Sequence, residues 1–332
     1  MALREEDEFL HQPPEGAPPR WQENLFFICW DLATTTGLLA HVQRVPGADF
    51  QEAQVVVAVG GRLASTSLAG PYRSGGLLPD LVATPVEPFR SWRFQCEGKG
   101  RAGAGPLGFY ATRAGGDTPV SVDLMLASTL PVADFGEGLA AVVRGMRADA
   151  GGPQMGDQQH YEQGGVWRGR LRVGDHEAEA AGLFVRDHSW GVRNEHSRFE
   201  AFWTASCLDD GRLFCNAIGI PRGDRVIGVG AVVDGSGATF TTEVGAAFLP
   251  AAGPGGYDRA VVTFGAPLAR TLTATTQLHI PIYLPHSGPS RYDNNAISTV
   301  GLGSARGFGV MEWASVLDDD DVRRLEAEVP SP

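Results

Sequence analysis

Short apolar runs, each ended by a turn signal, recur along almost the whole chain. Residues 24–32 (NLFFICWDL) and 36–45 (TGLLAHVQRV), for example, flank a short polar turn. Gly60-Gly61, Asp210-Gly211 and Asp234-Gly235 each separate two such runs, as the turn of a β-hairpin does. Runs this short that are rich in β-branched and aromatic residues are typical of strands. The pattern predicts an all-β fold, and the 44 glycines agree with many tight turns.

The strand pattern is interrupted between residues 133 and 159. Residues 136–147 are compatible with a short helix, and the Gly- and Gln-rich stretch after them is typical of a linker. We therefore predict a domain boundary near residue 155, between halves of similar length and pattern that suggest two β-barrels or β-sandwiches. The predicted parts are an irregular N-terminal arm (1–20), an N-terminal β domain (21–155), and a C-terminal β domain (156–332) that ends in a short helix.

Charge and composition argue against several classes of partner. The net charge is −12 with a pI near 5.1, so the chain lacks the basic surface that nucleic acid or anionic lipid requires. No segment approaches the roughly 18 apolar residues of a membrane-spanning helix. The 4 cysteines form no CxxC pair, and the 8 histidines show no zinc-like spacing. We expect a cytoplasmic protein with no metal, no cofactor, no nucleic-acid partner and no integral membrane segment.

The densest polar chemistry lies in residues 183–193 (LFVRDHSWGVR). In a regular strand Arg186, His188 and Trp190 share one face, whereas Asp187 lies on the other. Whichever face points inward buries an ionisable group, which must be paired or must change its pKa. The segment therefore either braces a buried hydrogen-bond network or lines a pocket.

This segment, together with RWQENLFFICWD, HYEQGGVWRGRLRV and GFGVMEW, resembles the carotenoid 1,2-hydratase-like, two-domain lipocalin-like superfamily. That superfamily includes noncanonical terpene cyclases and Diels–Alderase-like relatives. The resemblance covers about residues 21–313, and DHSWG (187–191) is its most specific part. It implies two lipocalin-like, calycin-type antiparallel β domains, with an apolar pocket between or within them.

The resemblance also implies a chemistry. Such relatives hydrate isoprenoid double bonds, cyclise terpenoid chains through carbocations, or guide cycloadditions without covalent catalysis. The first two reactions begin when a carboxylic acid protonates an alkene, and they need no cofactor. We therefore expect an acid-initiated enzyme that acts on an isoprenoid or terpenoid olefin by hydration or cyclisation. A cofactor-free pericyclase and a non-enzymatic carrier of hydrophobic small molecules remain open, and the sequence does not indicate the oligomeric state.

Asp187 is the expected proton donor, with His188 and Arg186 tuning it. The alternative role of Asp187 is to pair with an arginine and hold a domain interface, because structural ion pairs perturb pKa values as catalytic ones do. Aromatic rings attract positive charge and would stabilise a carbocation, although each of them has core packing as its other role. The residues expected to bind substrate are Trp30, Trp190, Trp203, Trp313, Tyr161, Glu23 and Asp31.

Asp31, Glu23 and His160 each carry an explicit alternative. Asp31 follows an apolar strand and would serve either as a second acid or as a turn-initiating residue. Glu23 lies beside a tryptophan and would either face the pocket or pair with an arginine. His160, next to Tyr161, would either donate a proton or pack at a strand edge.

Overall fold

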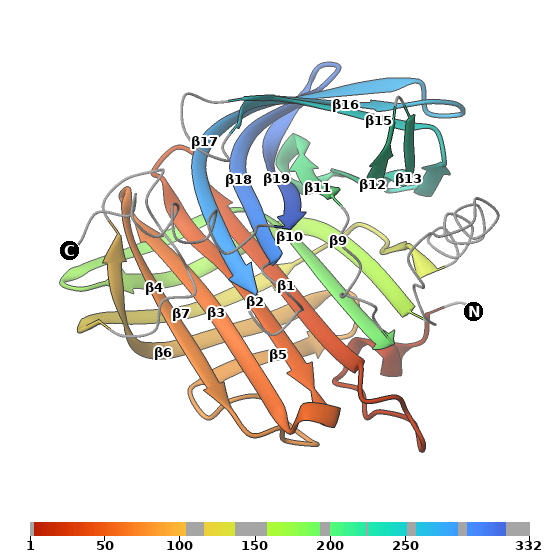
Figure 1. Cartoon of the computed structure of the whole chain (residues 1–332). Coiled ribbons are helices and arrows are strands. Elements are labelled where there is room, and N and C mark those ends of the chain that lie inside the picture. Colours follow the sequence, from red (N-terminus) through yellow and green to blue (C-terminus); the bar gives the residue numbers. More distant parts are fainter. Residues whose placement is uncertain are drawn as a thin grey trace.

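A computed structural model describes residues 3–103, 116–136, 158–192, 200–223, 225–250, 257–284 and 291–316. It confirms the predicted all-β class, since nearly all of its regular structure lies in two antiparallel sheets (Figure 1). The three predicted hairpin turns lie where glycine marked them, between β3 and β4, β11 and β12, and β13 and β14. The C-terminal helix and almost all of the predicted helix 136–147 fall outside the described residues.

The first sheet closes into a barrel. Strand β10 hydrogen-bonds to both β1 and β9, which completes a ring in the order β1-β2-β3-β4-β6-β7-β9-β10. Two further strands extend it, β5 (Leu81–Glu87) on β6 and β8 (Ala133–Asp134) on β9. The ring strands are β1 (Trp21–Asp31), β2 (Thr36–Val45), β3 (Phe50–Val59), β4 (Arg62–Gly70), β6 (Ser91–Gly103), β7 (Thr118–Ala127), β9 (Gln158–Val173) and β10 (His176–Val192).

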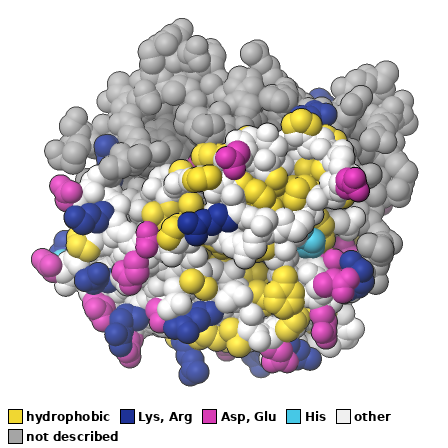
Figure 2. Space-filling view, turned by 90° about the horizontal axis from the view of Figure 1, so that it is seen from below, with side chains coloured by type: hydrophobic (Ala, Val, Ile, Leu, Met, Phe, Trp, Pro, Cys, Tyr) yellow, Lys and Arg dark blue, Asp and Glu magenta, His cyan; other side chains and the backbone are white. Residues whose placement is uncertain are grey.

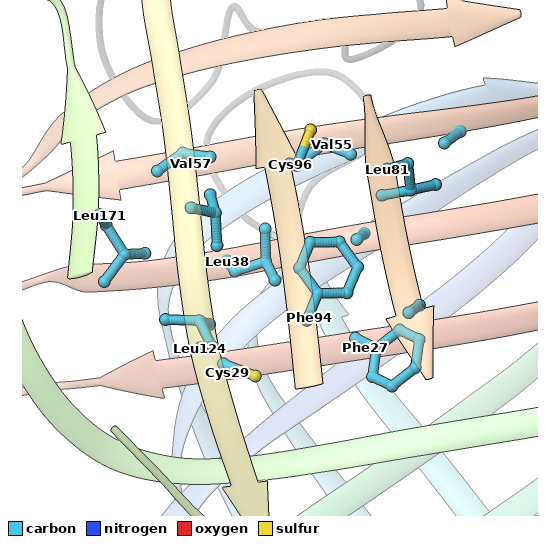
Figure 3. Close-up of a cluster of buried hydrophobic side chains, with 14 of the residues drawn as sticks. Phe27, Cys29, Leu38, Val55, Val57, Leu81, Phe94, Cys96, Leu124 and Leu171 are labelled. Atoms are coloured by element: carbon cyan, nitrogen blue, oxygen red, sulfur yellow. The ribbon is translucent and has the colours of Figure 1, made fainter. Parts of the chain in front are cut away.

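Side chains fill the interior of the barrel. Alternate residues of β1, such as Phe27 and Cys29, point inward and are almost completely buried. They meet Leu38 of the neighbouring strand β2, and Phe94 and Leu124 of β6 and β7, as the close-up in Figure 3 shows. Tight filling of this kind is expected of an eight-stranded barrel. The middle of the barrel is therefore a packed core, and the polar chemistry lies at its end and on its outer face.

The second sheet is open and packs across the outer face of β1, β9 and β10 (Figure 1). Its order is β14-β13-β12-β11-β19-β18-β17-β16-β15. Phe26 and Val185 of the barrel belong to the same buried apolar cluster as Phe214 and Ile280 of this sheet, so the two sheets share one core. The strands are β11 (Ala201–Leu208), β12 (Leu213–Arg222), β13 (Arg225–Asp234), β14 (Gly237–Thr241), β15 (Val244–Pro250), β16 (Tyr257–Phe264), β17 (Arg270–Leu284), β18 (Arg291–Leu302) and β19 (Ala305–Val316).

The division between the sheets differs from the sequence-based division of the chain. The boundary predicted near residue 155 lies outside the described residues, but β9 and β10 follow it and belong to the first sheet. The second sheet begins at Ala201. The residue pattern of a strand does not indicate which other strand it pairs with, because contacts between residues distant in sequence decide the pairing.

The remaining short elements are 3-10 turns: η1 (Glu5–Glu8) in the N-terminal arm, η2 (Pro46–Ala48) and η3 (Asp209–Gly211). Within the described residues, no helix is long and apolar enough to cross a bilayer. Figure 2 shows the molecule from below, with charged side chains of both signs spread among apolar ones. Such mixing is ordinary for a surface that faces solvent.

Candidate functional site

Strand β10 divides its polar side chains between two buried clusters, as strand periodicity predicted. We call the first the barrel-end network; it lies inside one end of the barrel and joins β10 to the N-terminal arm. We call the second the interface cluster; it lies on the outer face of β10, against the second sheet. The barrel-end network consists of Glu8, His11, Glu23, Arg44, Tyr161, Gln163, Arg186 and His188, and the interface cluster of His160, Glu162, Asp187, Trp203 and Asn216.

Glu23 is the centre of one half of the barrel-end network. Its Oε1 accepts the backbone N–H of His11 at 2.9 Å, and lies 2.8 Å from His11 Nδ1 and 2.9 Å from His188 Nε2. Its Oε2 accepts from the guanidinium of Arg44, which is fully buried. Burial alone would raise the pKa of Glu23, but the hydrogen bonds from His11 and His188 and the charge of Arg44 bring the pKa well below its usual value. Glu23 is therefore a permanently ionised carboxylate.

Glu8 is the centre of the other half. Arg186 Nη2 donates to its Oε1 at 2.6 Å, and the Tyr161 hydroxyl donates to its Oε2 at 3.0 Å. The indole N–H of Trp92 also donates to Oε1. The Arg186 guanidinium lies 5.0 Å from the ring centre of Trp92 and 5.2 Å from that of Tyr161, within cation–π range. An acidic residue of the irregular arm thus neutralises an arginine inside the barrel.

Tyr161 connects the two halves. Its hydroxyl also lies 2.9 Å from His188 Nδ1. A hydroxyl has one proton, so Tyr161 cannot donate to Glu8 and to His188 at the same moment. Burial lowers the pKa of His188, which favours the neutral ring. If that ring donates Nε2–H to Glu23, its Nδ1 needs the Tyr161 proton, and the two acceptors compete for it.

The interface cluster holds its acidic groups differently. His160 Nε2 lies 2.9 Å from Glu162 Oε1 and forms a close ion pair with Asp187 Oδ2. The indole N–H of Trp203 donates to Glu162 Oε1 at 2.7 Å, and the Asn216 amide donates to Oε2. Trp203 and Asn216 come from β11 and β12, so the cluster spans the gap between the two sheets.

The electrostatics of this cluster favour a stored proton. Burial would lower the pKa of His160, but the charges of Asp187 and Glu162 raise it to about 10. Burial raises the pKa of Glu162, which lies between the sheets with no exposed surface. Of the three side chains Asp187 is the most accessible, 14% exposed against 8% for His160 and 0% for Glu162. Asp187 is therefore the group that another molecule could reach.

The surroundings of the interface cluster are apolar and aromatic. The ring centres of Phe26 and Trp203 are 5.4 Å apart. The ring centre of Phe135 lies 5.6 Å from that of His160 and 5.4 Å from that of Phe240. A few converging polar groups in an apolar setting are the usual form of a small-molecule site.

Two trios of side chains have ligand atoms close enough for a metal ion, within 4.8 Å of one another. In His11, Glu23 and His188, the carboxylate is already neutralised by Arg44. In His160, Glu162 and Asp187, a cation would have to displace the proton of an imidazole whose pKa is about 10. Both trios therefore suit protons better than metal ions.

Eight of the ten residues predicted to form one site are distributed over three places. Glu23, Tyr161, Arg186, His188 and Trp190 belong to the barrel end, where Trp190 stacks on His11 at 3.9 Å. Asp187 and Trp203 lie in the interface cluster, and Trp30 belongs to the apolar core between the sheets.

Two predicted residues lie apart from both clusters. Asp31 accepts the Ala33 N–H at 3.0 Å and the Thr34 hydroxyl at 2.5 Å, so it shapes the β1–β2 turn. Trp313 packs against Phe248 at 5.0 Å, in the apolar cluster on the other face of the second sheet.

Sequence reasoning missed Glu8, His11, Arg44, Glu162 and Asn216. One signal was present for Glu162. It belongs to QQHYEQ (158–163), a run of six residues with polar groups at the start of β9, of which residues 160–163 are buried. A buried polar run of that kind predicts a network on both faces.

A groove of about 990 Å³ runs along the outer surface of the barrel, over β6, β7, β9 and β10. It is lined largely by exposed charged side chains, including the ion pair of Arg93 and Asp123. It contains none of the residues of either cluster.

Comparison with known proteins finds one matching family model and several solved structures with a similar fold. Residues 4–317 match the family model described as Domain of unknown function (DUF7064). No protein with a curated description matches the sequence. Among solved structures, a protein assigned as AttH from Nitrosomonas europaea is similar with a TM-score of 0.64 at 16% identity, covering 93% of this chain and 98% of its own.

Two further similar structures have names that refer to an activity or a bound molecule. Kievitone hydratase from Nectria haematococca has a TM-score of 0.56 at 7% identity, covering 92% of this chain and 93% of its own. CghA with Sch210972 has a TM-score of 0.55 at 13% identity, covering 93% and 97%. At identities this low, the similarity shows a shared fold alone.

Proposed function

Given that the chain belongs to the DUF7064 family and shares its fold with a hydratase, we propose that it is an enzyme that protonates the carbon–carbon double bond of an apolar, isoprenoid-like substrate at the interface cluster. The observation that carries the proposal is the trio of His160, Glu162 and Asp187, buried between two sheets in aromatic surroundings. Despite burial, the charges of the two carboxylates raise the pKa of His160 to about 10, so the trio retains a proton at neutral pH.

The proposed reaction uses the residues as follows. The proton held on His160 passes to Asp187, whose Oδ2 it contacts. Asp187 gives it to one alkene carbon, so that a C–H bond forms, the π bond breaks and the neighbouring carbon becomes a cation. Water attacks that cation and returns a proton to the Asp187 carboxylate, which yields an alcohol. If another double bond of the substrate attacks first, a ring forms instead.

The other residues of the cluster have supporting roles in this proposal. Glu162, held by Trp203 and Asn216, orients His160 and is a positioning residue. The rings of Trp203, Phe26 and Phe135 stabilise the developing positive charge, because an aromatic face attracts cations.

The test is a turnover assay in D2O with a panel of prenylated aromatic compounds and acyclic isoprenoid alkenes. Hydration adds the mass of D2O, whereas cyclisation followed by proton loss adds one deuterium. We expect Asp187→Asn to lower turnover by about 100-fold or more, since a positioned acid contributes roughly 10²–10⁴. Glu179→Gln, at an exposed position on the same strand, is the matched control and should keep full activity.

The contrary outcomes separate the alternatives. Full turnover by Asp187→Asn would exclude Asp187 as the proton donor. Turnover without deuterium uptake would favour a pericyclase. Saturable quenching of tryptophan fluorescence by these compounds, without turnover of any of them, would favour a carrier.

A further inference from the structure

Glu8 lies in the barrel end in the way that a bound ligand would, surrounded by hydrogen-bond donors. Its carboxylate has no exposed surface and receives donors from three barrel strands, Trp92 on β6, Tyr161 on β9 and Arg186 on β10. Glu8 itself belongs to the arm, which forms no strand pairing among the residues that the structure describes. The barrel therefore supplies the receptor, and the arm supplies the anion.

The receptor has more donors than Glu8 uses. Arg186 Nε is buried and has no hydrogen-bond partner among the described residues, although the same guanidinium donates to Glu8 and Gln163 through Nη2. A buried arginine with a spare N–H suits a carboxylate placed for two parallel hydrogen bonds, which the arm does not provide.

The arm also indicates the shape of such a ligand. Two residues beyond Glu8, the side chain of Leu10 packs against the apolar core of the barrel, whereas Phe9 between them is 47% exposed. The arm thus presents a carboxylate followed by an apolar group. It turns back before β1 through Gly16, whose φ of 74° suits a residue without a side chain.

From these contacts we propose that the barrel end is a binding site for a monocarboxylate with an apolar body, which Glu8 and Leu10 of the arm occupy until a ligand displaces them. This site lies on the opposite face of β10 from Asp187 and does not depend on the chemistry proposed for the interface cluster. Removal of the arm carboxylate leaves Arg186 as a buried cation without its ion-pair partner, and a free carboxylate would restore that pair.

The first test replaces Glu8 and adds back its lost group. In full-length Glu8→Ala, propionate, which carries the deleted carboxymethyl group and one further carbon, should raise Tm in a saturable manner. Propionamide, its neutral isostere, should not. Glu6→Ala is the matched control, since Glu6 lies in the same 3-10 turn with its side chain 67% exposed. Absence of a propionate response in Glu8→Ala overturns the proposal.

The second test keeps the native receptor and does not require that Glu8→Ala folds. All 4 native cysteines are buried, so a spin label on Phe9→Cys reports the arm selectively. Saturating decanoate should increase the mobility of the label, and decan-1-ol should leave it unchanged. An immobile label in the presence of decanoate means that Glu8 is a fixed structural partner, which overturns the proposal. Asp187→Asn should leave both responses intact, so failure here and failure of the proposed catalysis are distinguishable.

Discussion

The barrel-end network and the interface cluster bury similar groups on opposite faces of β10, yet they balance charge by different means. At the barrel end, Glu8 and Glu23 are each paired with an arginine, Arg186 and Arg44. At the interface, two carboxylates share one histidine, His160. An arginine stays charged at any pH that a folded protein meets, whereas the charge of a histidine depends on its surroundings.

This difference assigns different properties to the two regions. The arginine of each barrel-end pair keeps its charge at every pH of interest, so the loss of the partner carboxylate leaves a buried charge. In the histidine-centred cluster, the charge can change through the gain or loss of a proton, with every side chain still present. Stability should therefore depend most on the barrel end in mutational tests, and the alkaline limit of stability should depend on the interface.

The largest effect is expected from Arg44→Met. The substitution removes the cation from Glu23 in a fully buried ion pair. Breaking such a pair costs about 3–5 kcal/mol of unfolding free energy, measurable by urea denaturation. A loss below about 1 kcal/mol would mean that the two histidines beside Glu23 suffice to stabilise it.

The next effect concerns alkaline pH. The pKa of His160 is about 10 in the fold and about 6.5 unfolded, so its contribution to stability is full below pH 6.5 and is lost as pH rises through 10. The free energy of unfolding should fall by up to about 1.4 kcal/mol per pH unit across this window. His160→Gln should be less stable at pH 6.5 and should lack that slope. An unchanged slope would assign the alkaline limit to another group.

The barrel end should set the acid limit of stability. Burial lowers the pKa of His188. Below pH 6.5 this histidine is therefore protonated in the unfolded chain while it stays neutral in the folded one. The pKa of Glu23 is also lowered, and its contribution is lost as pH falls below its unfolded value of about 4.3. Stability should therefore fall with acid, first from His188 and then from Glu23. His188→Gln should flatten the profile between pH 6.5 and 5 while leaving the alkaline slope unchanged, and equal slopes in both proteins would contradict this.

The smallest effect is expected outside both clusters. Arg170 pairs with Glu177 and Glu179 at 3.2 and 3.1 Å, but its side chain is 61% exposed. Exposed pairs of this kind contribute little to stability, so Arg170→Met should leave the midpoint of urea denaturation nearly unchanged. A marked decrease would show that distance alone, rather than burial, ranks the ion pairs of this protein.

Sequence periodicity was sufficient to separate Asp187 from Arg186 and His188, because alternation along a strand is a local property. It was also sufficient for the hairpin turns, where Gly60-Gly61 and Asp234-Gly235 mark the chain directly. The same reasoning could place polar groups on two faces of β10. It could not say what lies opposite each face.

The partners of those groups come from distant segments. Glu8 meets Arg186 across 178 positions of sequence, and nothing in the arm's own composition indicates that contact. Asn216 meets Glu162 only because β12 packs over β9. The assignment of strands to the two sheets is not evident in the sequence for the same reason, since β9 and β10 have the pattern of any strand and packing decides which strands they pair with.

Closure of the barrel by β10 has a consequence for synthesis of the chain. Phe26 of β1 pairs with Asp187 of β10, about 160 residues later, and a ribosome adds roughly 5–20 residues per second. The hydrogen-bonding edge of β1 that awaits β10 is therefore open for roughly 8–30 s after β1 has emerged. An open edge flanked by the run NLFFICW is a template for pairing with another nascent copy. Slower translation before residue 176 should lower the soluble yield of this protein, and a holdase chaperone present during that interval should restore it.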